Sequence, residues 1–495
     1  MMTMKRNSGW MIVAAAVLAA CSGGGDITDS GQDATTTVAA STVPGDTAAT
    51  TTTVAPDSLP DCPTDALDSA TGTVEIEFWH GMSGPLNDEL VRLTDEYNSS
   101  QSKVRVSLVQ GSYEETSDNY LQSSQDGRPD LVQTPEYMVQ SMLDTESTVP
   151  VGKCIDASGY DTSTFVPSAL SAYATEGMQW SMPFNISNPV LFYNKRVFEA
   201  AGLDPNKPPA SLDELRTMSQ KIIDSGAAKY GIAVESGFDS GGGWYVEQWF
   251  CKAEEFYLDN DNGRSNRATK VLYDNATGVE LLTFMQDLLK DGLAVNVGDN
   301  SISGYDNLLK MADAKEAAAM TINTSASLGP VLTVLGGGQF PNITGDDVGV
   351  AAMPGPDGKP GALIGGASLW VVDSGDDVRT AAAWDYVTWL VGAQQQSEWA
   401  SATGYVPVRS DAADLEPYKT VLATDPRFSV ALAQLEASPE GPTSAGPVVG
   451  PLREIRSVLA TAVAAIFEGA DVATTLADAA KQANGLIADY NSRNS

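Results

Sequence analysis

Three polar residues in one short segment are the first candidates for binding chemistry. Asn185, Ser187 and Asn188 carry hydrogen-bonding side chains. Pro183 and Pro189 flank them, and each proline favours extended backbone in itself and in the residue before it. An extended crossing between two lobes would present these side chains to a cleft. A buried strand entered through a proline-marked loop explains the same pattern, and the local sequence leaves both interpretations open.

Catalytic and metal chemistry find little support in the residue types. The chain has one histidine, His80, so sites built on several histidines are excluded and any Ser–His or Cys–His catalysis would depend on it. A single histidine after a strand is more often structural, and we assign it no chemistry. Residues 259–263 (Asp-Asn-Asp-Asn-Gly) lack the spacing and the closing glutamate of an EF-hand, so we predict a turn. We expect no metal and no cofactor.

The charge balance narrows the possible partners. The 495 residues include 29 Lys+Arg and 64 Asp+Glu, for a net charge of −35. This argues against nucleic acid and against an anionic membrane surface as main partners. A small anionic ligand remains possible, because one well-placed arginine can dominate locally.

The N-terminus predicts export. Lys5 and Arg6 precede an apolar run over residues 10–20 that is too short to span a bilayer. The small residues before Cys21 resemble a bacterial lipobox, which implies a signal peptide over 1–20 and lipid on Cys21. An ordinary signal with an incidental cysteine is the alternative. The Thr-, Ser- and Gly-rich segment 21–72 is predicted to be a flexible tether.

Three cysteines remain after Cys21. Cys62, Cys154 and Cys251 allow one disulfide and one free thiol in an exported protein. We favour Cys62–Cys154, because each lies near the end of an early segment, but the other two pairings stay open.

Strands and helices then alternate. Val74, Ile76 and Phe78 alternate with glutamates, a helix-favouring segment begins at Pro85, and a second strand follows over 104–108. This βαβ pattern predicts a parallel sheet with ligands at the carboxyl ends of its strands. Those ends hold Trp79, His80, residues 111–113 and residues 129–136.

Further elements follow along the chain. Residues 211–214 form a predicted capping box that opens a helix. Strands are predicted near 318–323, 348–353 and 364–372, and helices over 378–392, 394–402 and about 452–490.

The order of motifs resembles a known family, the extracellular solute-binding proteins of bacterial ABC importers, and within it the Ugp-type glycerol-3-phosphate-binding branch. The motifs that carry the resemblance are 78–82 (Phe-Trp-His-Gly-Met), 182–187 (Met-Pro-Phe-Asn-Ile-Ser), 189–195, 201–204, 320–321, 364–370 (Ile-Gly-Gly-Ala-Ser-Leu-Trp), Trp399 and 403–407 (Thr-Gly-Tyr-Val-Pro). The resemblance spans roughly residues 73–491. It implies an α/β, two-lobed periplasmic-binding-protein-like fold with hinge strands and a ligand cleft.

The resemblance also implies domain limits. The first lobe would comprise 73–184 and 323–371. The second lobe would comprise 185–322 and 372–495.

Ligand contacts carry over residue by residue. Arg456 would offer a fork of donors to phosphate oxygens, and Glu136 would accept hydrogen bonds from glycerol hydroxyls. The other implied contacts are Tyr113, Ser187, Trp244, Thr324, Ser325, Gly366 and Tyr405. Arg456 lies near Glu454 and Arg453, so a solvated charged face is the alternative for that residue.

One departure affects the predicted ligand. The family usually places a second tryptophan just before Trp244, where this chain has residues 240–243 (Ser-Gly-Gly-Gly). A wider pocket would admit a diester such as glycerophosphocholine, whose quaternary ammonium suits aromatic faces. We hypothesise that diesters bind at least as well as sn-glycerol 3-phosphate.

Two other functions compete with this one. The same scaffold could bind a neutral sugar or oligosaccharide, which would not need Arg456. An exported hydrolase using paired carboxylates is the third hypothesis, but no spacing singles out a pair and no Gly-x-Ser-x-Gly motif is present. We expect a binding protein and not an enzyme: a monomer held on the outer face of the cell membrane that works with separate permease and ATPase subunits.

Overall fold

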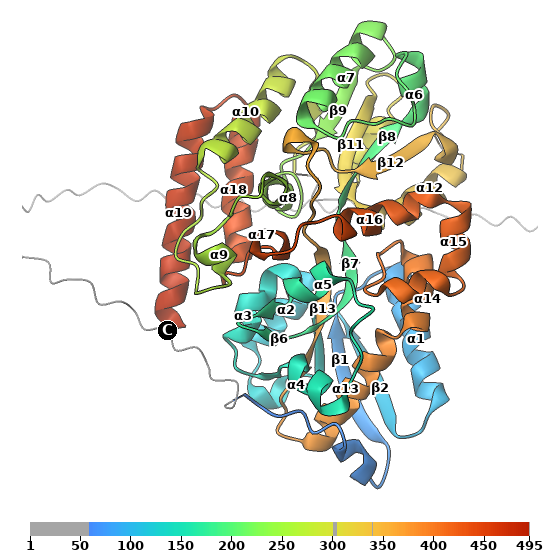
Figure 1. Cartoon of the computed structure of the whole chain (residues 1–495), viewed down its shortest axis with the longest axis vertical. Coiled ribbons are helices and arrows are strands. Elements are labelled where there is room, and N and C mark those ends of the chain that lie inside the picture. The colour runs from blue at the N-terminus through green and yellow to red at the C-terminus, as the bar shows by residue number, and fades with distance from the viewer. Residues whose placement is uncertain (1–58, 300–303, 339, 495) are drawn as a thin grey trace, which may run out of the picture. The chain divides into compact units, whose positions relative to one another are not determined.

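Two β-sheets organise the part of the chain that the computed structural model describes, residues 59–299, 304–338 and 340–494. The first sheet has the strand order β2-β1-β3-β13-β4, with β7 paired to β13, and the second has the order β10-β9-β11-β8-β12. Figure 1 shows the first sheet in its lower half and the second in its upper half. We call each sheet with the helices packed on it the first and the second lobe, and this two-lobed α/β arrangement is the predicted one.

The strand bounds are as follows. The first sheet contains β1 (Val74–His80), β2 (Val104–Gln110), β3 (Leu131–Pro135), β4 (Thr148–Val149), β7 (Met182–Ser187) and β13 (Gly365–Val372). The second contains β8 (Pro189–Asn194), β9 (Tyr230–Val234), β10 (Ala294–Asn296), β11 (Ala318–Thr324) and β12 (Val348–Ala352). A separate hairpin pairs β5 (Ala174–Thr175) with β6 (Met178–Gln179).

The predicted βαβ unit is confirmed. β1 and β2 run parallel, with Val74 opposite Val104, and α1 (Pro85–Ser100) connects them with its proline in the first turn. Ile76 and Phe78 alternate with more exposed residues along β1, so one face of the strand enters the core. The unit therefore brings the carboxyl ends of both strands to one edge of the first sheet.

The chain crosses between the sheets at Asn188. β7 pairs with β13 in the first sheet, and β8 pairs with β11 and β12 in the second. The predicted crossing between lobes is confirmed. Every residue of both strands is buried, so the buried strand considered as the alternative is also present. The Asn188 side chain donates to the carbonyl of Ala431 at 2.8 Å and accepts from Gln434 at 2.9 Å. Asn188 therefore fixes the crossing to the helix that holds these two residues.

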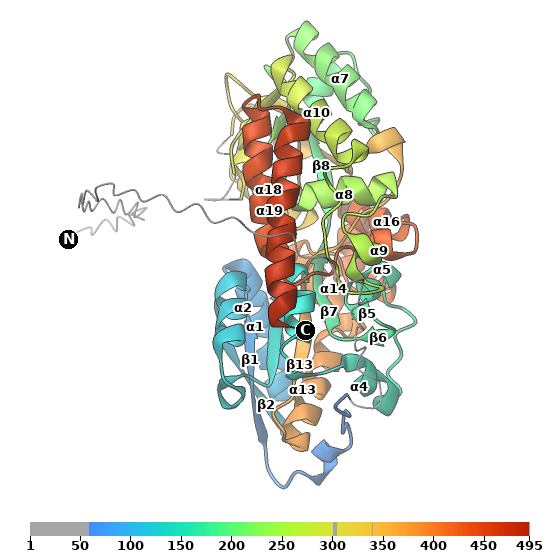
Figure 2. The same cartoon turned by 90° about the vertical axis from the view of Figure 1, so that its left-hand side faces the viewer.

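Helices cover both sheets. In the first lobe α1, α2 (Tyr113–Gln122) and α13 (Asp377–Leu390) pack on the sheet, and α5 (Pro167–Ala172) packs on β7. In the second lobe the sheet contacts α7 (Leu212–Ser225), α10 (Ala276–Lys290), α11 (Asp306–Met311) and α16 (Val430–Glu436). Figure 2 shows α18 (Leu452–Phe467) and α19 (Val472–Arg493) side by side, packed on α10.

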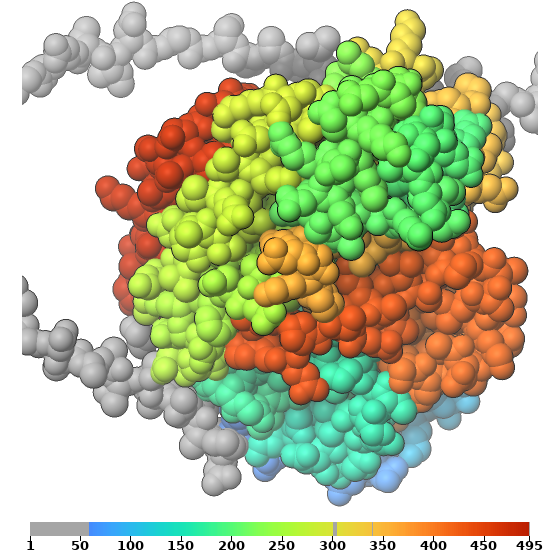
Figure 3. All heavy atoms as spheres, turned by 45° about the horizontal axis from the view of Figure 1, so that its top comes forward, coloured from blue at the N-terminus to red at the C-terminus, as the bar shows by residue number. Residues whose placement is uncertain are grey.

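The remaining helices connect these elements. They are α3 (Val139–Leu143), α4 (Val151–Ser158), α6 (Lys195–Ala200), α8 (Trp244–Ala253), α9 (Asp259–Gly263), α12 (Leu328–Gly336), α14 (Ala393–Thr403), α15 (Tyr418–Thr424) and α17 (Pro442–Ala445). The predicted capping box is present at the start of α7, where Ser211 and Glu214 bond each other's backbone N–H groups. In the space-filling view of Figure 3, orange-red chain that includes α14 to α16 lies between the green and yellow surface of the second lobe and the teal surface of the first.

The folded region begins before Thr73, which corrects the predicted limit of the tether. Residues 59–72 are described, and Ala66–Ser69 form a short 3-10 helix that packs against α13 and buries Leu67. Cys62 forms the favoured disulfide with Cys154, and Cys251 is free and buried. One covalent link and one apolar residue thus order a segment whose composition suggested a linker. Signal peptide, Cys21 and the tether up to residue 58 lie outside the described residues.

Two elements lie in a different lobe from the predicted one. β12 was grouped with the first lobe but pairs antiparallel with β8 in the second sheet. α13 was grouped with the second lobe but packs on β1 and β13. The chain crosses to the first lobe after β12 and not before it, and it stays in the first lobe through α13. The other domain limits remain predictions.

The predicted C-terminal helical segment is two helices and not one. α18 ends at Phe467 and α19 begins at Val472, with Gly469 at a φ of 104° and Asp471 capping α19 through the backbone N–H of Thr474. A backbone with that φ favours glycine and turns the chain between the helices.

A candidate solute-binding cleft

Arg456 of α18 is the centre of a buried charged cluster. Its Nε and Nη2 donate to the two carboxylate oxygens of Glu247 on α8 at 2.7 and 2.8 Å, and its Nη1 donates to Glu136 Oε1 at 3.0 Å. Glu136 follows β3 of the first sheet directly. The Arg456 side chain is 2% exposed, so the solvated charged face considered from the sequence is wrong. The predicted partners Arg456 and Glu136 are brought into contact, and Glu247 is an addition.

In this cluster the attraction between opposite charges offsets the cost of burying them. Burial opposes the charge of Arg456, but Glu247 and Glu136 hold its pKa well above the usual range. Burial raises the pKa of Glu136, against the opposing effect of the guanidinium. Asp239 lies 3.7 Å from Arg456 Nη1; desolvation by the surrounding protein and the neighbouring carboxylates raise its pKa, although half of its side chain is exposed to solvent. The arginine therefore already has two counter-ions, the buried Glu247 and the half-buried Glu136, before any ligand is considered.

A polar network joins the first lobe to the crossing strand. Asn185 of β7 donates to the Tyr113 hydroxyl at 2.7 Å and accepts from Gln133 at 2.7 Å. Gln133 in turn accepts from the backbone N–H of Gly81 at 2.9 Å. Tyr405 lies close to Asn185 and Tyr113, and burial raises the pKa of both tyrosines. Tyr113 and Tyr405, predicted from distant parts of the sequence, thus meet through Asn185.

Trp244, Ser187 and the glycine pair of β13 form a third group. Gly365 is the register partner of Ser187, and an added Cβ at Gly365 would lie 2.4 Å from the Trp244 ring. The tryptophan therefore packs flat on the glycine backbone. Its Nε1 is buried and has no hydrogen-bond partner among the described residues.

Gly366 has a structural explanation. Its φ is 99°, and an added Cβ would lie 1.9 Å from the carbonyl oxygen of Asn185. The close approach of β7 therefore requires glycine here, whether or not its amide also reaches a ligand.

Thr324 and Ser325 support the crossing. The backbone N–H of Ser325 donates to the Asn188 carbonyl at 2.9 Å, and its hydroxyl accepts from Asn188 N at 3.3 Å. Thr324 caps the short helix that follows, through the backbone N–H of Ala326. These bonds place both residues beside the hinge, and their role as ligand contacts stays a prediction.

Two hollows border these groups. The larger, about 590 Å³, has Tyr113, Tyr405 and Glu114 in its wall. The smaller, about 20 Å³, is lined by Glu136, Glu247, Arg264 and Arg456, and holds about one water molecule. We call the region between and around them the cleft.

Arg264 is a site residue that the sequence did not reveal. Its five N–H groups donate to backbone carbonyls on two segments, residues 171–174 at the end of α5 and Ala445 and Gly446 after α17. Burial lowers the pKa of Arg264 to about 9. A left-handed turn presents it, because Asn260, Asp261 and Asn262 have φ values of 53°, 56° and 62°. The predicted turn is confirmed, but no local pattern indicated its contact with the first lobe.

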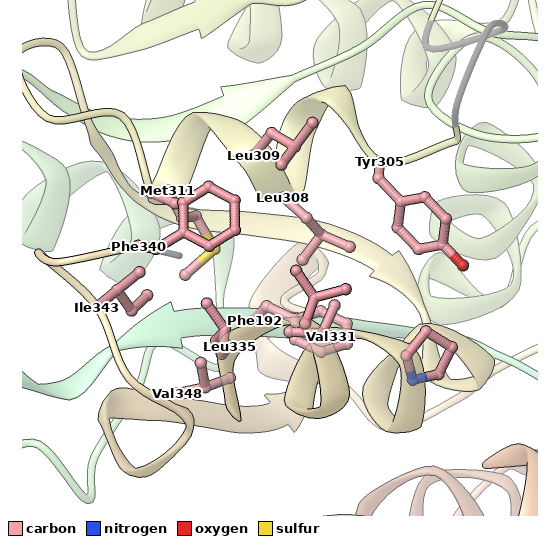
Figure 4. Close-up of a pocket in the computed structure, with 13 residues that line it drawn as sticks. Phe192, Tyr305, Leu308, Leu309, Met311, Val331, Leu335, Phe340, Ile343 and Val348 are labelled. Atoms are coloured by element: carbon pink, nitrogen blue, oxygen red, sulfur yellow. The ribbon is translucent and has the colours of Figure 1, made fainter. Parts of the chain in front are cut away.

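An apolar pocket of about 260 Å³ lies elsewhere in the second lobe. Figure 4 shows side chains of α11 and α12, among them Leu308 and Val331, facing one another above Phe192 and Val348. Its wall carries one side-chain hydroxyl, that of Tyr305. A polyol or a phosphate needs several polar partners, so this pocket is unsuited to such a solute.

In the described part of the chain, no three His, Cys, Asp or Glu side chains are grouped so that they could hold a metal ion. None of its helices combines the length and the apolar composition that crossing a membrane requires.

Comparison with known proteins identifies the family. Residues 92–428 match the family described as bacterial extracellular solute-binding protein. The chain is 28% identical over 415 residues to the sn-glycerol-3-phosphate-binding periplasmic protein UgpB of Yersinia pseudotuberculosis, covering 81% of this chain and 89% of that protein.

Solved structures share the fold. The crystal structure of UgpB from Mycobacterium tuberculosis in complex with glycerophosphocholine matches with a TM-score of 0.68 and 21% identity, over 85% of this chain and all of that one. The cyclic alpha-maltosyl-1,6-maltose binding protein from Arthrobacter globiformis matches with a TM-score of 0.68 and 23% identity, over 84% and 99% of the two chains. The predicted periplasmic-binding-protein-like fold is confirmed, and since the family match spans most of its length, this chain belongs to the bacterial extracellular solute-binding proteins of ABC importers.

Proposed function

We propose that this protein captures a glycerophosphodiester, such as glycerophosphocholine, and delivers it to the permease of its importer. The UgpB relatives support a phosphoglycerol ligand, and the UgpB structure from Mycobacterium tuberculosis contains the diester. The wider pocket expected from the glycine run before Trp244 does not support the diester, because an added Cβ at Gly241, Gly242 or Gly243 would lie 1.9, 2.2 or 2.0 Å from a backbone carbonyl oxygen. The choice of the diester over the monoester depends on the charges in the cleft.

The charge balance of the smaller hollow is the observation that carries the proposal. Its lining contains two carboxylates, Glu136 and Glu247, and two guanidinium groups, Arg264 and Arg456. These four charges cancel, and Asp239, 3.7 Å from Arg456 Nη1, adds a further carboxylate beside them. A phosphate monoester carries roughly two negative charges near neutral pH and would leave the closed cleft strongly negative. Glycerophosphocholine balances its phosphodiester with its own quaternary ammonium, so it suits a neutral site.

We expect the ligand to enter by exchange at Arg456. Glu247 holds two donors of the guanidinium and Glu136 holds one, so Glu136 is the easier partner to replace. A phosphodiester oxygen would take the donor that Glu136 gives up. The freed Glu136 would then accept hydrogen bonds from the glycerol hydroxyls. Tyr113 and Tyr405 would contribute hydroxyl donors, and the ring of Trp244 would contact the ammonium group.

A neutral sugar or oligosaccharide is the second candidate. The same zero charge balance suits an uncharged polyol, and carboxylates are good acceptors for sugar hydroxyls. The cyclic alpha-maltosyl-1,6-maltose binding protein from Arthrobacter globiformis has the same fold. In this case Arg456 would serve to hold Glu136 and Glu247 in place.

Calorimetric titration of the purified protein with glycerophosphocholine, sn-glycerol 3-phosphate, maltose and trehalose separates the candidates. The proposal expects heat from the diester, weaker or no binding of the monoester and none of the sugars. Binding of sugars alone would refute the phosphoglycerol assignment. Binding of the monoester alone would refute the charge argument.

Anchoring and partners belong to the same proposal. Lipid on Cys21 would hold the protein, as a monomer, at the outer face of the membrane, where separate permease and ATPase subunits receive the solute. Expression of Cys21→Ala in the native host should release the protein into the soluble fraction. Retention of that variant in the membrane fraction would contradict lipid anchoring at this residue.

A further inference from the structure

Tyr137 lies against the charged cluster around Arg456, and neither the sequence motifs nor the relatives indicated it. It follows Glu136 in the short helix after β3 and is 4% exposed. The guanidinium carbon of Arg456 lies 5.5 Å from the centre of its ring, within range of a cation–π contact. The ring therefore covers the arginine that joins Glu136 to Glu247.

Among the described residues, the hydroxyl of Tyr137 lacks a hydrogen-bond partner, as do the hydroxyls of Tyr173, Tyr257 and Tyr273, but of these four tyrosines only Tyr137 has a ring that covers Arg456. The Tyr137 hydroxyl is buried. Most buried polar side-chain atoms in folded proteins have a partner, because an unpaired one costs stability. A ligand that supplies the missing partner would explain why the hydroxyl is there.

The surroundings of this hydroxyl favour a neutral partner. Burial and the carboxylates of Asp239, Glu114 and Glu136 hold the pKa of Tyr137 above its usual value, so the hydroxyl stays protonated and can donate or accept. The same carboxylates disfavour an anionic oxygen at that point. A ligand hydroxyl fits better than a phosphate oxygen.

The glycine run on the opposite side makes this arrangement possible. An added Cβ at Gly243 would lie 2.0 Å from the carbonyl oxygen of Phe238 and 3.0 Å from the Cβ of Arg456. Any larger residue there would press on the arginine stem. Arg456 thus lies between the backbone of Gly243 from the second lobe and the ring of Tyr137 from the first.

We infer that Tyr137 is a specificity-determining residue whose hydroxyl binds a hydroxyl group of the ligand's glycerol or sugar part. The inference depends on solute binding at the cleft, as proposed above, but not on which of the two ligand classes binds.

Tyr137→Phe tests the inference, because it removes the hydroxyl and keeps the ring over Arg456. We expect about three- to ten-fold weaker binding of glycerophosphocholine, the effect of losing one hydrogen bond between neutral groups. The melting temperature without ligand should be unchanged or higher, because the variant no longer buries an unpaired hydroxyl. Tyr273→Phe is the matched control. Tyr273 is also buried with an unpartnered hydroxyl, but its ring packs on Tyr257.

The outcomes are distinct. Equal affinity of wild type and Tyr137→Phe would overturn the inference while leaving the proposed function intact. A lower melting temperature without ligand, with equal losses of affinity in Tyr137→Phe and Tyr273→Phe, would show a structural role and overturn it too. If the wild type binds maltose and not the diester, the proposed function fails, and the same weakening of maltose binding in Tyr137→Phe would still support the role of the hydroxyl.

Discussion

At the scale of single residues, Arg456 decides both the stability and the chemistry of the cleft. Replacing it by methionine keeps much of the side-chain volume but leaves Glu247 and Glu136 buried without a cation. We expect Arg456→Met to lower the free energy of unfolding by about 3–5 kcal/mol, the typical cost of breaking a buried ion pair. Urea unfolding without glycerophosphocholine measures the loss of stability, and unfolding with it measures whether the ligand still stabilises the variant.

A second substitution provides the control. Arg456→Met combined with Glu247→Gln removes one of the two unpaired charges, so part of the lost stability should return. If the double variant is no more stable than Arg456→Met, the pairing with Glu247 does not explain the loss.

His80 gives the fold a defined sensitivity to acid. It is fully buried, and burial lowers its pKa to about 4. Between pH 6.5 and 4 the unfolded chain binds a proton that the folded chain does not, so this contribution to stability is present above pH 6.5 and is lost as the pH falls. The difference corresponds to roughly 3 kcal/mol.

The sole histidine makes the measurement simple. The NMR resonances of His80 in the native protein should stay in the neutral form down to about pH 5. His80→Gln should lose less stability than the wild type between pH 7 and 4 in urea unfolding. Titration of the native imidazole near pH 6.5 would contradict this prediction.

The sequence could predict which residues approach the cleft but not how they pair. Arg456 and Glu136 were expected as ligand contacts from the family resemblance, and the structure joins them. Glu247 lies 209 residues from Arg456 in sequence, and no local pattern indicates a contact over that separation. Tyr137 shows the same limit, because an aromatic residue after a strand is equally typical of an ordinary core.

At the scale of elements, the left-handed turn before Arg264 tolerates little change. Gly263 has a φ of 77°, and an added Cβ would lie 2.0 Å from the Val448 carbonyl. Gly292 has a φ of 71°, but nothing lies within 4 Å of its added Cβ. Gly292→Ala should therefore cost about 1 kcal/mol of backbone strain, and Gly263→Ala clearly more. If thermal unfolding showed equal losses of stability in Gly263→Ala and Gly292→Ala, the clash at Gly263 would have been relieved without cost.

Element prediction succeeded where periodicity was strong. The alternation in β1, the proline that starts α1 and the capping box of α7 all depend on neighbouring residues, and all three were correct. The lobe of β12 and α13 was wrong, because pairing partners and crossovers are long-range features. The prediction that segment 59–72 is a flexible tether was wrong for a related reason, since one disulfide orders the segment despite its polar composition.

At the scale of the whole molecule, the Cys62–Cys154 disulfide ties the start of the folded region to the first lobe across 92 residues. Replacing both cysteines by serine should lower the free energy of unfolding by about 2–5 kcal/mol, the usual range for a native disulfide. Cys251→Ser is the control, because this buried thiol is free. A loss no larger than that of the control would mean that the packing of Leu67 alone orders the segment.

The contact between Glu136 and Arg456 has a kinetic consequence. When the solute leaves, the carboxylate of Glu136 can bind the guanidinium of Arg456 at once. The protein therefore does not have to expose an unpaired charge during release. We expect this self-competition to shorten the lifetime of the complex. Glu136→Gln, which weakens the competitor and keeps its shape, should slow dissociation in stopped-flow measurements. An unchanged or faster dissociation rate would contradict this. A binding protein that must release its solute to a permease benefits when one of its own side chains can take the place of the ligand.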